Sequence, residues 1–241
     1  MEIKTIYEDE NVLVVDKPAR VIVFPEGVSR EKTLINYLVE KNSKLAEAGA
    51  PPRFGIVHRL DKDTSGILLV AKSNETLIFL QKCFKNREVE KKYVCLVEGD
   101  IKQDNGKIET LVARSSRDPR KQTVYQKNDP LAPKSSREAI TEYKVLKRYK
   151  DFTLLEVKIT TGRRHQIRCH LSYLQHPVAG DKLYGFKNSK APEGLTRQFL
   201  HAKYLKIKLP ASPSQCGSQK EAKEFESELP QELKQILDRL K

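Results

Sequence analysis

The sequence has few cysteines and no long apolar run, and both absences narrow the class of protein. Its four cysteines, Cys83, Cys95, Cys169 and Cys216, are far apart and include no C-x-x-C pair. Neither a zinc site nor a disulfide framework is therefore indicated, and we expect reduced, mostly buried thiols. The N-terminal stretch MEIKTIYEDE is charged, and no uninterrupted apolar stretch could span a bilayer. These features predict a cytoplasmic protein that does not engage a membrane.

Several catalytic and metal-binding motifs are also missing. The five histidines show no H-E-x-x-H or similar spacing, so we expect no metal site. H-R-x-D at residues 58–61 also occurs in kinase catalytic loops, but the sequence has no Gly-rich loop, V-A-I-K-like strand or D-F-G. Phosphoryl transfer of the kinase type is therefore excluded.

The charge balance is strongly basic. The chain has 45 Lys and Arg against 32 Asp and Glu, a net charge of +13. Residues 211–241 hold five basic and six acidic groups, so 40 minus 26, or +14, remains on residues 1–210. Such an excess favours a polyanionic partner, of which nucleic acid is the commonest large example. A lysine-rich surface that merely keeps the protein soluble explains the charge equally well.

The sequence contains more strand patterns than helical patterns, and several consecutive strands are predicted to form hairpins. This predicts an α+β fold with a central mixed, mostly antiparallel β-sheet flanked by helices and loops. We expect a single catalytic domain over residues 1–241, with a body at 1–210 and a C-terminal segment at 211–241 that carries an amphipathic helix. Residues 115–137 are predicted to be a long basic surface loop. The predicted strands are 3–17 (two), 66–71, 91–99, 141–149, 152–160 and 199–209, and the predicted helices are 33–46, 73–84, 165–175 and 228–241.

HRLDKDTSG, residues 58–66, places Asp61 just before the buried strand GILLVA. A surface ion pair is the commonest explanation of an isolated Arg-x-Asp. Hydrolysis of a glycosidic bond would need two cooperating carboxylates, and Asp63 is the only neighbour available for that role. The residues by themselves leave these alternatives open.

TTGRRHQIRCHL, residues 160–171, reads as a glycine-containing turn that leads into a helix. On a helical wheel Ile167, Leu171 and Leu174 form a buried stripe, and Arg164 and Arg168 lie together at its edge. Such arginines could hold a carboxylate ionised and oriented, could bind phosphate, or could lie on a solvated face.

Five ordered blocks together resemble one known family. They are EDENVLVVDKPA, HRLDKDTSGILLVAKS, KKYVCLV, TTGRRHQIRCHL with HPVAGDKLYG, and FLHAKYLKIKLP, and in this order they are similar to the RluA-type RNA pseudouridine synthases. The resemblance covers residues 6–210. It implies an isomerase, without cofactor or metal, that converts uridine in ribosomal or transfer RNA to pseudouridine.

The resemblance also implies roles for single residues. Asp61 is similar to the family's catalytic aspartate, which either attacks the sugar carbon or assists elimination to a glycal. Arg168 is similar to the arginine that pairs with this aspartate, and Tyr93 to the tyrosine that stacks on the target base. Arg59 would fill the gap left by the flipped base, since a planar guanidinium stacks well. We also expect substrate contacts from His58, Lys62 and Arg164.

The sequence departs from the family pattern in a few places. Arg20 follows DKPA where glycine is common, Phe24 precedes Pro25 where histidine is frequent, and Arg164 replaces a threonine. The chain also starts at the catalytic body, so we expect no S4-like RNA-binding module, and we expect a monomer. A noncatalytic RNA-binding protein on the same scaffold stays an alternative, although the presence of Asp61, Tyr93 and Arg168 together argues against it.

Overall fold

The computed structural model describes residues 3–25, 31–210 and 220–240. It confirms an α+β fold built mainly from antiparallel strands. The chain forms two compact units, which are described separately below. One comprises Met1–Glu90 with Ala202–Glu228, and the other Lys91–His201 with Leu229–Lys241.

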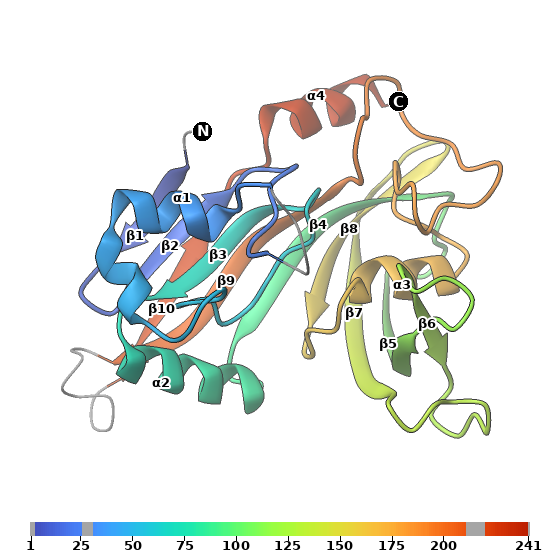
Figure 1. The fold of residues 1–241 in the computed structure, drawn as a ribbon. Coiled ribbons are helices and arrows are strands. Elements are labelled where there is room, and N and C mark those ends of the chain that lie inside the picture. The colour runs from blue at the N-terminus through green and yellow to red at the C-terminus, as the bar shows by residue number, and fades with distance from the viewer. Residues whose placement is uncertain (1–2, 26–30, 211–219, 241) are drawn as a thin grey trace. The chain divides into compact units, whose positions relative to one another are not determined.

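The described residues of the first unit form five strands, which are labelled in Figure 1. They are hydrogen-bonded in the order β1-β2-β3-β9, and β10 also pairs with β9. The β1–β2 hairpin was predicted, and its turn is closed by Asp9, which accepts hydrogen bonds from the backbone N–H groups of Asn11 and Val12. The strands are β1 (Lys4–Glu8), β2 (Val12–Lys17), β3 (Ser65–Ala71), β9 (Leu200–Pro210, in this unit from Ala202) and β10 (Lys220–Glu226).

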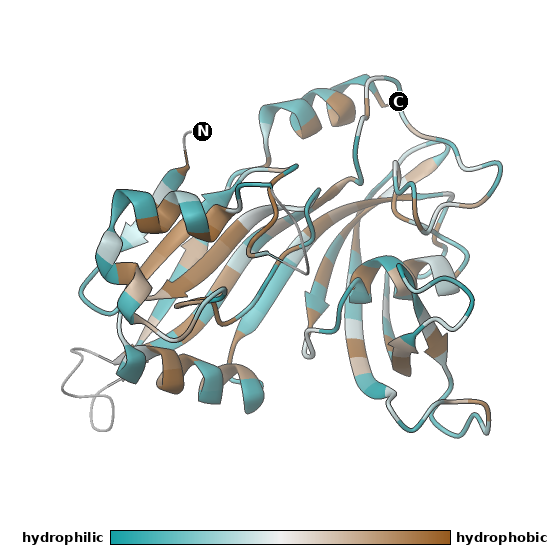
Figure 2. Ribbon diagram, in the orientation of Figure 1, coloured by the Kyte–Doolittle hydropathy of each residue, from teal (hydrophilic) through white to brown (hydrophobic). Residues whose placement is uncertain are grey.

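The central strands of this unit are buried on both faces, which explains their continuous apolar sequences (Figure 2). Helix α2 (Asn74–Lys85) covers one face with Leu77, Leu80 and, less deeply, Phe84, as its spacing predicted. Ser73 caps the helix by accepting from the N–H of Thr76. The helix predicted for residues 33–46 is shorter than expected: α1 (Leu34–Lys41) ends at Asn42, and a 3₁₀ turn, η1 (Ser43–Glu47), follows.

In the part of the second unit that the structure describes, five strands are ordered β4-β8-β7-β5-β6, and all the neighbouring pairs described within it are antiparallel. The predicted hairpin is β7 with β8, and the alternation of Leu155, Val157 and Ile159 with polar residues matches their burial. Residues 105–114 form a strand that the sequence did not predict. The strands are β4 (Glu90–Glu98), β5 (Asn105–Arg114), β6 (Gln122–Tyr125), β7 (Arg137–Arg148) and β8 (Phe152–Ile159).

The prediction that residues 115–137 form only a surface loop was wrong in part, because β6 lies within this segment and pairs with β5. Its residues are half-buried and show no clear alternation. A four-residue strand of this kind is stabilised by its partner strand rather than by its own pattern.

Two helices complete the second unit. Helix α3 (Gln166–Tyr173) packs through Cys169 against residues of β5 and β7. Helix α4 (Gln231–Arg239) buries Leu233 and Ile236 in a second cluster with β4 and β8, so the predicted amphipathic helix does dock. The sequence analysis assigned no element to the residues before it, and β10 there pairs with β9 through seven residues. Cys83, Cys95 and Cys169 are buried free thiols, and Cys216 lies outside the described residues.

Candidate active site

The HRLDKDTSG loop connects a short bridge at Ile56 to strand β3 in the first unit. Within it the backbone N–H of Thr64 donates to the carbonyl of Asp61 at 3.1 Å, so a tight turn follows the aspartate. Asp61 is half-buried, whereas Leu60 and Thr64 on either side are buried. The loop is thus fixed at both ends, and its aspartate remains accessible to solvent.

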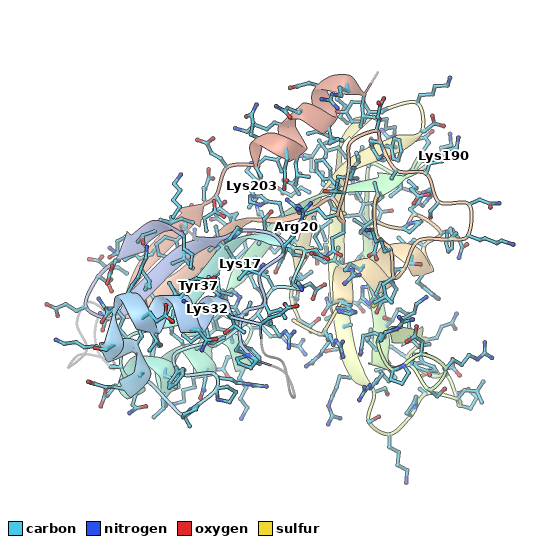
Figure 3. All side chains as sticks on the ribbon, turned by 45° about the horizontal axis from the view of Figure 1, so that its top comes forward. Lys17, Arg20, Lys32, Tyr37, Lys190 and Lys203 are labelled. Carbon is cyan, nitrogen blue, oxygen red and sulfur yellow. The ribbon has the colours of Figure 1, made fainter. Side chains whose placement is uncertain are left out.

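A buried lysine holds this loop. Lys17, labelled in Figure 3, is fully buried at the end of β2, and its ammonium donates to the carbonyl oxygens of Pro18, Val21 and Lys62 at 2.8, 2.8 and 3.0 Å. Three carbonyl acceptors match the three N–H groups of an ammonium. Because Lys62 follows Asp61 directly, Lys17 fixes the backbone next to the candidate catalytic residue.

Arg59 lies near an aromatic ring that sets this sequence apart. Its guanidinium carbon is 5.2 Å from the centre of the buried Phe24 ring, and that of Arg53 is 4.7 Å from the same centre. Phe24 stands where the resemblance leads us to expect a histidine. A ring face attracts a guanidinium, so this departure provides a surface on which Arg59 can lie.

The other departure in the first unit has a backbone explanation. Arg20 has a φ of +68°, in the left-handed region that glycine adopts without penalty. A glycine, which the resemblance leads us to expect here, would adopt this φ without strain, whereas Arg20 adopts it at an energetic cost.

His58 and Lys62 make contacts that suit a supporting role. The N–H of Leu69 donates to Nε2 of His58 at 2.9 Å, and the His58 ring stacks on Phe84 with centroids 4.9 Å apart. Lys62 is exposed and its ammonium lies 2.8 Å from a carboxylate oxygen of Glu31. Contact of either residue with a substrate stays a prediction.

In the second unit, α3 begins later than the sequence suggested. His165 is its N-cap and has a left-handed φ of +54°, so Arg164 lies before the helix and is exposed. The predicted pairing of Arg164 with Arg168 on one helix edge is therefore wrong, because the wheel assumed that the helix already included residue 164. Arg168 itself lies within α3 and is buried.

Polar side chains, rather than apolar ones alone, bind α3 to the sheet. Gln166 donates to the carbonyl of Ile140 and to the hydroxyl of Thr141, at 2.9 and 3.0 Å. One helical turn later the ring nitrogens of His170 lie 2.8 Å from Thr141 Oγ1 and 2.9 Å from Thr110 Oγ1. Burial lowers the pKa of His170 to about 4, so the imidazole is neutral at physiological pH.

Arg168 makes a bidentate pair with Asp181, which the sequence analysis did not identify as a site residue. Nε donates to Oδ2 at 2.6 Å and Nη2 to Oδ1 at 2.8 Å, and the Asp181 side chain is 0% exposed. Burial by itself raises the pKa of Asp181, but the hydrogen bond and charge of Arg168, with the N–H groups of Tyr184 and Leu183, bring the pKa below its usual value. The signal was present in HPVAGDKLYG, where a single aspartate follows the uncharged run PVAG.

Tyr93 and Cys95 lie on the same side of β4, because alternate residues of a strand share a face. Burial, and then the charge of Asp181, raise the pKa of the Cys95 thiol. The bridge between Val97 and Val178 joins β4 to the segment that leads to Asp181.

Cations gather where the chain enters α3. Burial, and then the charge of Arg163, lower the pKa of Lys91 to about 8.

Tyr184 contacts the basic segment at 115–137. Its hydroxyl accepts a hydrogen bond from the N–H of Gln122 at 2.6 Å, and the Lys121 ammonium lies 5.9 Å from the centre of its ring. The structure thus groups Tyr93, Arg168 and Asp181 in one unit and His58, Arg59 and Asp61 in the other.

Within residues 3–25, 31–210 and 220–240, no group of three or more His, Cys, Asp or Glu side chains is arranged to hold a metal ion. The same part of the chain has no helix with the length and hydropathy needed to cross a membrane.

Comparison with known proteins gives the family. The model of the family described as RNA pseudouridylate synthase matches residues 11–173. The chain belongs to this family. It is 45% identical, over 195 residues, to an uncharacterized RNA pseudouridine synthase of Aquifex aeolicus, with 80% of this chain and 59% of the relative covered. The match to the ribosomal large subunit pseudouridine synthase D of Xylella fastidiosa is 36% over 213 residues, covering 84% and 60%.

The chain therefore spans about six tenths of the length of these two relatives. A solved human structure, RNA pseudouridylate synthase domain containing 4, matches with a TM-score of 0.75 over 99% of this chain and 94% of that chain, at 23% identity. At this identity the likeness supports the fold. Membership of the family confirms the resemblance that the five sequence blocks indicated.

Proposed function

We propose that this protein isomerises uridine in RNA to pseudouridine, with Asp61 as the catalytic carboxylate. In this reaction the bond from ribose C1′ to N1 of the base breaks, the base turns, and C1′ is rejoined to C5, so that the RNA mass does not change. The observation that carries the proposal is the accessible Asp61 in a loop held by Lys17, in a chain that belongs to this family. A fixed, ionised carboxylate is what attack on C1′ or glycal formation needs.

The remaining site residues take roles around Asp61. We propose that Arg168 is a catalytic residue together with Asp61, that Tyr93 stacks on the extruded base, and that Arg59 fills the vacated place in the RNA stack. The half-buried Arg59 beside Phe24 supports the role of Arg59. His58, Lys62 and Arg164 would contact the RNA. The two units would act together as one catalytic domain spanning residues 1–241.

For the substrate, we propose ribosomal or transfer RNA, with RNA of the large ribosomal subunit first, because relatives bear the name ribosomal large subunit pseudouridine synthase D. The net charge of +13 suits any of these polyanions. We propose further that the protein works in the cytoplasm, as a monomer, without metal or cofactor. Three buried free thiols are compatible with a reducing compartment.

Release of tritium from RNA containing 5-tritiated uridine tests the function, because C5 loses its hydrogen when it bonds to C1′. Wild type should release tritium, and Asp61→Asn and Asp61→Ala should release none while keeping the fold and most of the RNA affinity. Asp63→Asn is the matched control and should stay active. Full activity of either Asp61 variant would refute the assignment, and liberation of free base or sugar would favour a hydrolase that uses Asp61 with Asp63.

A further inference from the structure

One buried ring in the first unit carries two guanidinium groups. The guanidinium carbons of Arg53 and Arg59 lie 4.7 and 5.2 Å from the centre of the Phe24 ring, so they are at most about 10 Å apart, the sum of these two distances. We propose that Arg53 binds a backbone phosphate of the RNA beside the nucleotide whose place Arg59 fills, and that Phe24 positions both guanidiniums. The inference rests on the proposed function, and it adds Arg53 to the residues that contact the RNA.

Backbone hydrogen bonds fix the segments that carry these three side chains. The first two N–H groups of α1 donate to the two carbonyls just before Phe24 at 2.8 and 3.0 Å. The Arg53 N–H donates to the carbonyl of Ala50 at 3.2 Å, and the Arg53 carbonyl accepts from the N–H of Ile56 at 3.0 Å. Arg59 lies in the HRLDKDTSG loop, which is held as described above. All three segments belong to the first unit, so this unit by itself places the ring and the two cations.

The contact with the ring leaves the hydrogen-bond donors of Arg53 available. A ring attracts a guanidinium through its face and takes up none of its N–H groups. Arg53 is exposed, and among residues 3–25, 31–210 and 220–240 no acceptor makes a hydrogen bond or ion pair with its guanidinium. One guanidinium can donate two parallel hydrogen bonds to a phosphate. Phe24 thus holds the charge of Arg53 in place and leaves its donating edge to a ligand.

Two like charges on one ring favour an anion beside them. The separation of the Arg53 and Arg59 guanidiniums, at most about 10 Å, is close to the Debye length of about 8 Å at physiological ionic strength, so salt screens their repulsion only in part. A phosphate between or beside them adds attraction to both. If Arg53 served only to cover the ring, its removal would not change the affinity for RNA.

The salt dependence of RNA binding tests Arg53, with a fluorescein-labelled RNA stem-loop that has uridines in its loop as the probe. In fluorescence anisotropy, Arg53→Gln should bind about 10-fold more weakly at low salt, because hydrogen bonds to a charged group are lost. The plot of log Kd against log salt concentration should become shallower by about 1, as expected for one lost phosphate contact. An unchanged affinity and slope would overturn the proposal.

Lys208→Gln is the matched control, because it also removes one positive charge from the first unit. Lys208 is exposed and lies toward the end of β9, away from Ala202, whose carbonyl is close to Gly66 of the HRLDKDTSG loop. Its affinity should stay within about twofold of wild type, with the same salt slope. Equal losses in Lys208→Gln and Arg53→Gln would mean that the RNA senses only the total charge, and would overturn the site.

Removal of single phosphate charges from the RNA locates the contact. Stem-loops that each carry one neutral methylphosphonate linkage should show a loss of about 10-fold with wild type at one linkage beside a uridine. Arg53→Gln should lose less than about twofold at that linkage, since its partner is already absent. Arg53→Lys, which keeps the charge, takes its place if Arg53→Gln does not fold, and its loss there should be smaller than that of wild type. Identical linkage profiles of wild type and variant would overturn the proposal.

Failure of this inference and failure of the proposed function give different results. Wild type that binds the stem-loops but releases no tritium from RNA containing 5-tritiated uridine would refute the isomerase, while the linkage profile still decides on Arg53. Tritium release together with an unchanged profile in the Arg53 variants would refute the phosphate site alone.

Discussion

The HRLDKDTSG loop of the first unit and helix α3 of the second unit both present candidate catalytic residues, but different contacts hold them. Lys17 holds the loop through backbone carbonyls, which every residue has. Gln166 and His170 hold α3 mainly through hydroxyls of particular threonines. The loop therefore depends on one buried cation and on backbone shape, whereas α3 depends on several matched side chains and on a neutral imidazole.

The largest effect should come from the backbone of the loop. Gly66 has a φ of +117°, and a Cβ added to it would lie 2.2 Å from the carbonyl oxygen of Ala202 in β9. Gly66→Ala should therefore reduce the free energy of unfolding by about 4 kcal/mol or prevent folding, as urea denaturation will show.

The matched control is in the other unit. At Gly162, in the turn before α3, the nearest atom to an added Cβ is the Lys91 ammonium nitrogen at 3.9 Å, an ordinary contact. Gly162→Ala should change stability by less than about 0.5 kcal/mol. Equal losses in the two variants would contradict the contrast between the two regions.

The second largest effect should come from removing the buried ammonium of Lys17. Lys17→Met leaves three carbonyls without their donor, which we expect to lower the free energy of unfolding by about 3 kcal/mol and to reduce the rate of isomerisation by moving Asp61. Lys203→Met, at an exposed lysine of the same unit (Figure 3), should be neutral in both urea denaturation and tritium release. A stable and fully active Lys17→Met variant would show that the loop keeps its conformation without the hydrogen bonds of Lys17.

The neutral imidazole gives α3 a pH dependence. The folded pKa of His170 is about 4, below the unfolded value of about 6.5, so between these pH values the unfolded state binds more protons. Its contribution to stability is complete above about pH 6.5 and falls by about 3 kcal/mol as the pH drops to 4. His170→Gln should lose this part of the pH dependence in urea titrations, and parallel curves for the two proteins would refute it.

The smallest effect concerns Arg20. Because its φ is +68°, Arg20→Gly should be more stable than Arg20→Ala by about 1 kcal/mol, since alanine retains the left-handed strain. Thermal unfolding of the two variants measures the difference directly. Equal midpoints would mean that the loop adopts another backbone conformation when the arginine is absent.

Strong local patterns led to correct predictions. The predicted strand 152–160, the predicted helix 73–84 and the predicted amphipathic helix 228–241 each match an observed element, because the signals depend only on neighbouring residues. Strands β5, β6 and β10 were missed. β10 is mostly charged, with Phe225 as its buried apolar residue, and it is a strand because β9 offers it a hydrogen-bonding edge.

The sequence by itself determined the family, the α+β class and the candidates Asp61, Tyr93 and Arg168, because spaced motifs carry this information locally. Only the tertiary structure decided that Lys17 is buried against the Asp61 loop and that Asp181 holds Arg168. These facts depend on contacts between residues distant in sequence. Burial turns such contacts into strong, directional interactions, and burial is a property of the folded chain.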